Sequence, residues 1–227
     1  GYTNLSNGGV YSNVTTATMS ITDVTSGMDG NLYRCELDNS ACNAVQSTGA
    51  TLTVQAAPNV TSDPSSTTVC VDDDPTFTVV ASGDALSYQW QVDQGSGFTN
   101  LSNGGVYSNV DAATMNITDA TAAMSGFIYR CEVDNSACTA DLSASATLTV
   151  HVAPSVTSAP ANSTTCENDN ATFTVSANGT SLTYQWQQDN GGGFANLSNG
   201  GSVSGATSAS LTLSSVGTGM DGYDYRL

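Results

Sequence analysis

The sequence predicts an all-β protein built from repeated β-sandwich domains. The string Asn-Leu-Ser-Asn-Gly-Gly begins at Asn4, again at Asn100 and again at Asn196, each 96 residues after the last. Apolar residues alternate with polar ones at a period of two, which is typical of half-buried strands. No segment keeps a 3.6-residue period long enough for a helix, and the abundant Thr, Val and Tyr favour strands.

The repeat divides the chain into three copies. Residues 1–57 and 97–153 are identical at 39 of 57 positions. Copy 1 (1–57) is therefore the C-terminal part of a repeat, copy 2 (58–153) is complete, and copy 3 (154–227) is an N-terminal part. A length of 96 residues suits one sandwich domain. We expect the chain to continue past both ends, with strand donation by a neighbouring molecule as the alternative.

Two short linkers join the copies, at 55–58 and 151–154. Each ends in a proline, Pro58 or Pro154, which stiffens the backbone. We therefore expect the domains to be arranged end to end as a semi-rigid rod.

Copy 2 contains the expected strands in order. They are 76–81, 86–92, a stretch around 115–117, 129–133 and 146–150. The first would point Phe77, Val79 and Ala81 to one face. The second would bring Trp90 into the sandwich core, where an indole is best accommodated. Met115 is expected in the same core, since it alternates inward with its neighbours.

Three stretches of copy 2 carry a family resemblance: Thr-Phe-Thr-Val from Thr76, Tyr-Gln-Trp-Gln from Tyr88 and Tyr-Arg-Cys from Tyr129. They resemble the immunoglobulin (Ig) fold, and within it the bacterial Ig-like repeats of very large surface proteins and adhesins of Bacteroidota type. The resemblance covers the whole chain. It implies a tyrosine corner at Tyr129, and a structural core that includes Trp90, Trp186, Tyr33, Tyr129 and Cys131.

The cysteines depart from the antibody pattern, because Val79 stands where the partner of Cys131 would be. A full repeat carries three cysteines, at the positions of Cys70, Cys131 and Cys138, so at least one thiol is unpaired or intermolecular. Copy 3 has Leu227 at the Cys131 position, which suits a buried free thiol. We expect a Cys70–Cys138 disulfide, with Cys131–Cys138 as the rival. Either one indicates an oxidising, extracellular compartment.

Composition excludes several function classes. The formal net charge is -17, with three arginines and no lysine, so the chain repels nucleic acid. No apolar run is long enough to span a membrane. His151 is the only histidine and its equivalent in copy 1 is Gln55, so we expect no histidine general base. With no catalytic constellation and near-identical tandem copies, we expect no enzyme.

Two charged clusters invite a functional interpretation. Asp72, Asp73 and Asp74 offer oxygen ligands for Ca²⁺, and the alternative is a solvated acidic turn. No other metal or cofactor is expected. The three arginines, Arg34, Arg130 and Arg226, occupy one repeat position. They suit a structural pair with a carboxylate such as Glu132, or else a repeated contact with an anion or glycan.

The sequence thus predicts an extracellular or cell-surface filament or stalk with a structural or adhesive role. Its partners would be further repeats or other copies of the protein, with surface glycans or cell surfaces as further ones. One alternative is an array of carbohydrate-binding modules, for which the aromatic candidates Tyr11, Tyr107 and Phe127 are sparse. Another is a spacer in a larger secreted enzyme.

Overall fold

The computed structural model describes all residues from 1 to 227 and contains strands and 3₁₀ turns but no α-helix, so the expected all-β fold is confirmed. The strands are β1 (Tyr11–Ser12), β2 (Ser20–Ile21), β3 (Leu32–Tyr33), β4 (Glu36–Leu37), β5 (Val45–Gln46), β6 (Ala50–Thr51), β7 (Asn59–Ser62), β8 (Thr67–Cys70), β9 (Thr76–Thr78), β10 (Val80–Ser82), β11 (Ser87–Asp93), β12 (Phe98–Asn100), β13 (Tyr107–Ser108), β14 (Thr114–Ile117), β15 (Ile128–Asp134), β16 (Asp141–Leu142), β17 (Ala146–His151), β18 (Ser155–Ser158), β19 (Ala171–Thr174), β20 (Ser176–Asn178), β21 (Gln187–Asp189), β22 (Ala195–Asn196), β23 (Val203–Ser204), β24 (Ser210–Leu213) and β25 (Asp224–Arg226). The 3₁₀ turns are η1 (Ser26–Met28), η2 (Ala122–Met124) and η3 (Thr218–Met220).

The chain divides into two compact units, and both include part of copy 2. Unit 1 comprises Gly1–Ser65, Thr76–Asn116 and Ile128–Ala146. Unit 2 comprises Ser66–Pro75, Ile117–Phe127 and Thr147–Leu227.

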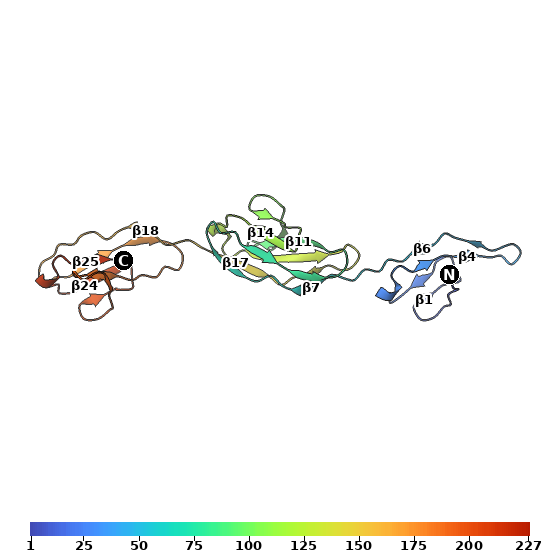
Figure 1. Ribbon diagram of the computed structural model, residues 1–227, viewed down its shortest axis with the longest axis horizontal. Coiled ribbons are helices and arrows are strands. Elements are labelled where there is room, and N and C mark those ends of the chain that lie inside the picture. The colour runs from blue at the N-terminus through green and yellow to red at the C-terminus, as the bar shows by residue number, and fades with distance from the viewer. The chain divides into compact units, whose positions relative to one another are not determined.

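Strands β11 and β15 form the longest pairing in unit 1, and β11 is labelled in Figure 1. They pair antiparallel over their full length, with β12 on the far side of β11. Trp90 lies opposite Cys131, and Gln91 lies opposite Arg130. Since residues directly opposite share a face, one face of this sheet carries the core and the other carries polar side chains.

The core of unit 1 is built around Trp90, which is fully buried. Its indole Nε1 donates to the carbonyl of Ala112 at 2.9 Å, so no polar atom of the ring is left unsatisfied. Phe77 packs between Trp90 and Tyr129, with ring centroids at 6.3 and 4.9 Å. Met115 and Cys131 are also fully buried.

The expected strand at 76–81 is interrupted. Its first half, β9, pairs with β14, whereas its second half, β10, pairs with β7 through an irregular register at Val80. Phe77 and Val79 are buried, but Ala81 is only partly buried. The uniform inward face predicted for this stretch is therefore wrong beyond Val79, because the chain changes its hydrogen-bonding partner there.

Unit 2 repeats the arrangement at positions 96 residues later in the sequence. Strand β19 pairs with β24, as β9 pairs with β14, and β21 pairs with β25. Trp186 is fully buried, its Nε1 donates to the carbonyl of Ser208 at 2.9 Å, and Phe173 stacks on Tyr225 with centroids 4.9 Å apart. By contrast, Tyr33 in copy 1 is only partly buried.

Candidate functional site

Every copy holds an arginine stacked on an aromatic ring. The guanidinium carbon of Arg130 lies 3.9 Å from the ring centroid of Phe98. The corresponding distance is 4.0 Å for Arg34 on Tyr2 and 3.8 Å for Arg226 on the exposed Phe194. These are the only arginines of the chain, and each lies over the aromatic ring 32 positions before it in the sequence. We call this group of side chains the arginine stack.

A glutamine holds the arginine stack in place. In unit 1, Arg130 Nε donates to Gln91 Oε1 at 2.7 Å. The amide nitrogen of Gln91 donates to Asn100 Oδ1 at 2.9 Å and to Glu132 Oε2 at 3.0 Å. Gln91 is almost fully buried although it lies on the polar face, because the stack covers it.

Unit 2 contains two of these three bonds, with the same atoms. Arg226 Nε donates to Gln187 Oε1 at 2.8 Å, and Gln187 Nε2 donates to Asn196 Oδ1 at 2.8 Å. The register explains the recurrence, since Gln187 lies directly opposite both Asn196 and Arg226 on its neighbouring strands. The arginine stack is therefore a feature of the repeat.

The expected partner of the arginine was wrong in one respect. Arg130 bonds Gln91, and it is Gln91 that bonds Glu132. A guanidinium has a flat face and a fixed fork of donors, so it can stack on a ring and hydrogen-bond an amide oxygen at the same time. Because Arg130 covers one face of Phe98, that face is closed to a stacking sugar. The sequence did contain a signal for this group: Phe98, Asn100 and Gln91 also recur at the 96-residue period.

Replacing Arg130 by lysine is expected to lower the free energy of unfolding by about 1 kcal/mol, because an ammonium loses both the planar stack and the Nε donor. Urea titration followed by circular dichroism measures the loss. Arg226→Lys is the matched variant in copy 3 and should show a loss of similar size. Two variants as stable as the parent chain would mean that the stack contributes nothing to stability.

The three aspartates that the sequence offered as calcium ligands lie at a turn, where two of them hydrogen-bond backbone N–H groups. Asp73 Oδ2 accepts the Cys70 N–H at 2.7 Å, and Asp74 Oδ1 accepts the Asp119 N–H at 2.9 Å. Asp72 has a φ of 71°. No group of three or more His, Cys, Asp or Glu side chains in the chain converges on a metal position. Asp73 and Asp74 thus accept hydrogen bonds from backbone N–H groups, a common role for Asp in turns.

The same turn occurs in copy 3 with different residues. Asn168 takes the place of Asp72 and has a φ of 69°. Both residues donate their N–H to a carbonyl across the turn, of Ala120 for Asp72 and of Val216 for Asn168, at 2.9 Å each. Asp and Asn are the side chains that best tolerate a left-handed backbone, so the position requires this geometry and no charge.

Neither expected disulfide forms, and all six cysteines are free. Cys138 lies beside the first linker, where its Sγ donates to the carbonyl of Gln55 at 3.7 Å. Cys70 lies beside the second, opposite His151 in the parallel pair of β8 and β17. The preferred pair is thus divided between two linkers. The rival pair is also absent, because Cys131 points into the core from β15.

The tyrosines proposed as sugar platforms are engaged with other tyrosines. Tyr107 Oη lies 3.2 Å from Tyr129 Oη, and Tyr11 Oη lies 3.3 Å from Tyr33 Oη. Burial, and after it the hydrogen bond with Tyr107, raises the pKa of Tyr129 well above its usual range. The structure provides no open aromatic platform at these two positions.

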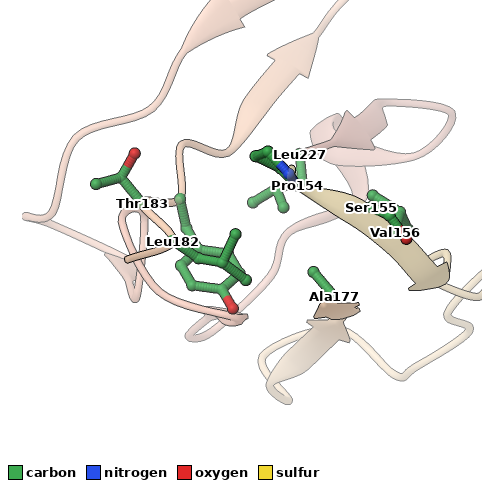
Figure 2. A pocket seen from close by; sticks show the side chains of 8 residues that line it. Pro154, Ser155, Val156, Ala177, Leu182, Thr183 and Leu227 are labelled. Atoms are coloured by element: carbon green, nitrogen blue, oxygen red, sulfur yellow. The ribbon is translucent and has the colours of Figure 1, made fainter. Parts of the chain in front are cut away.

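Two hollows lie in copy 3. Figure 2 shows a cavity of about 120 Å³ in copy 3 that is lined by Pro154, Ser155, Val156, Ala177, Leu182, Thr183, Tyr184 and Leu227. No carboxylate, imidazole or thiol lines it, so it lacks the convergent polar groups that a catalytic or ligand site needs. A second hollow runs along η3 in copy 3. Asp221 and Gly222 line this hollow, and their equivalents in copy 2, Ser125 and Gly126, hydrogen-bond β17. In copy 2, therefore, the corresponding surface is covered by a strand.

No protein-family model matches the chain, and no curated protein matches it. None of the helices in the structure is long and apolar enough to cross a bilayer.

Solved structures do match. A three-domain I-band fragment of titin aligns with a TM-score of 0.76 and 22% identity, over 97% of this chain and 78% of that one. Ig domains 1–4 of Sidekick-1 align with a TM-score of 0.57 and 19% identity, over 91% of this chain and 56% of that one. Extracellular domains 3–5 of Drosophila OTK align with a TM-score of 0.52 and 18% identity, over 91% and 68%. At these identities the likeness concerns the fold, and the fold of the chain is that of tandem Ig-like β-sandwich domains.

Proposed function

We propose that the chain is part of an extracellular structural or adhesive array of Ig-like repeats, with copies 1 and 3 as parts of neighbouring repeats and copy 2 as one complete repeat. The single observation that carries the proposal is repetition of the specialised features themselves. The stacking of an arginine on an aromatic ring recurs in all three copies. An active site gains little from tandem duplication, whereas length and avidity grow with each copy.

The finer assignment, to a large bacterial surface protein or adhesin, rests on the amino-acid sequences of the strands and on the composition of the chain. A net charge of -17 without any lysine gives a soluble surface that resists trypsin-like proteases, as a stalk outside a cell requires. Its partners in this proposal are further repeats of the same protein. Free thiols remove the disulfide argument for an oxidising compartment, so the extracellular location depends on these features alone.

A carbohydrate-binding array is the second candidate, and one observation favours it. An aromatic ring recurs on the polar sheet face in every copy, and Tyr2 and Phe194 remain 46% and 37% exposed. The arginine occupies one face of each ring, so a sugar would have to use the remaining face or edge.

Immunogold labelling of intact cells of the source organism, with antibodies raised against the 227-residue chain, tests the proposal. We expect gold particles outside the cell envelope, lost after brief protease treatment of whole cells. Labelling that appears only after permeabilisation would exclude the extracellular array. A glycan array probed with the same chain addresses the second candidate: binding lost in a Phe98→Ala, Phe194→Ala double variant would favour carbohydrate recognition over a structural role.

A further inference from the structure

In the second linker, the hydrogen bonds of the backbone switch from copy 2 to copy 3 between two adjacent residues, His151 and Val152. The carbonyl of His151 accepts the Val71 N–H at 2.9 Å, which ties the end of β17 to copy 2. The next residue, Val152, donates its N–H to Thr180 Oγ1 at 2.8 Å and accepts the Thr180 N–H at 3.0 Å. No unbonded residue separates the two sets of hydrogen bonds.

The first linker repeats the bonds to the following copy. Ala56, equivalent to Val152, donates its N–H to Asp84 Oδ2 at 2.8 Å and accepts the Asp84 N–H at 3.3 Å. Asp84 is equivalent to Thr180, so two chemically different side chains place an acceptor oxygen at the same point. Asn135 adds a third bond, from its Nδ2 to the carbonyl of Ala56 at 2.9 Å.

A glycine makes room for the linker in both copies. Gly83 has a φ of 139°, and a Cβ built on it would lie 2.9 Å from the carbonyl oxygen of Ala57 and 3.1 Å from Pro58 Cα. Gly179 has a φ of 148°, and its Cβ would lie 3.1 Å from Pro154 Cα. Any side chain at these positions would both strain the backbone and push the linker away.

We propose that each linker is a docked strap that folds as part of the copy that follows it, so that the backbone from Ala56 or Val152 onward is ordered together with that copy. The bonding pattern stands without the proposed function. The two hydrogen bonds to one turn residue, together with the glycine that leaves room for the linker, add a specific anchor to the stiffness that proline alone gives.

Amide hydrogen exchange of the whole chain, followed by nuclear magnetic resonance, tests the strap. The Val152 amide should exchange at least about tenfold more slowly than in an unstructured peptide, and Thr180→Val should speed it about fivefold by removing the acceptor. Exchange of amides in β19 should not change. Thr172→Val is the matched control, because Thr172 is an exposed threonine of copy 3 outside the strap.

The first linker supplies an independent arm with a rescue. Asp84→Ala should speed exchange of the Ala56 amide, and Asp84→Asn should restore protection, since an amide oxygen is still an acceptor. Gly179→Ala should loosen Val152 while Trp186 fluorescence stays native. Rapid exchange of Val152 and Ala56 in the parent chain, or protection unchanged in Thr180→Val and Asp84→Ala, would overturn the strap. None of these readouts depends on where the protein is located or what it binds.

Discussion

Trp90→Ala is expected to lower the free energy of unfolding of copy 2 by about 4 kcal/mol. The indole is fully buried, packs on Phe77 with centroids 6.3 Å apart, and donates to the carbonyl of Ala112. Alanine would leave a cavity between the two layers of the sandwich and an unpaired carbonyl in it. Urea titration followed by far-ultraviolet circular dichroism measures the loss without relying on tryptophan fluorescence.

Two variants make this result interpretable. Trp186→Ala removes the equivalent indole from copy 3, which is also fully buried and bonded, so its loss should be comparable. Val80→Ala removes a side chain that is 54% exposed and should change stability by less than about 0.5 kcal/mol. A loss below about 1 kcal/mol for both tryptophans would mean that the sandwich core is not organised around them.

Period-two alternation predicted the buried strands well because burial on one face selects it directly. In β15, Tyr129, Cys131 and Val133 are buried and the residues between them are not. Alternation failed where the hydrogen-bonding partner changes. Val79 to Ala81 reads as one continuous strand, yet the structure switches from β14 to β7 there. The alternation of apolar and polar side chains indicates which residues are buried. It contains no information about which neighbouring strand the segment hydrogen-bonds.

The candidate site was harder to predict, because its members are polar. Gln91 lies in the middle of a strongly alternating strand and reads as an exposed residue, although Arg130 and Phe98 cover it. The recurrence of all three at one period was visible, but the contact between them depends on strand register, which the sequence leaves open.

The side-chain directions in the acidic turn and the positions of the cysteines were hard to predict for a related reason. Three consecutive aspartates suggest a metal site, yet adjacent residues of a turn point their side chains in different directions. Asp73 and Asp74 each bond a different backbone N–H. Counting cysteines likewise says how many could pair, whereas pairing requires two sulfur atoms within reach.

Cys131 is expected to resist alkylation in the native chain at a rate at least about a thousandfold below that of Cys70, since its labelling requires opening of the sandwich. Cys131 is fully buried, whereas Cys70 is exposed. Burial raises the pKa of the Cys131 thiol from its ordinary value of 9.0 to about 11, a hydrogen bond from the Gln89 backbone opposes the rise, and the charge of Glu132 adds to it. Only the thiolate reacts, so the raised pKa slows the reaction further.

The same shift gives the sign of a pH effect. The unfolded state loses the Cys131 proton before the folded state does, so stability should fall as the pH rises from about 9 towards about 11. Timed labelling with iodoacetamide, peptide mapping without reduction and a urea-unfolded control complete the experiment. In urea all six cysteines should label. Rapid native labelling of Cys131 would contradict a closed core, and recovery of a disulfide-linked Cys70–Cys138 peptide would contradict their separation beside two different linkers.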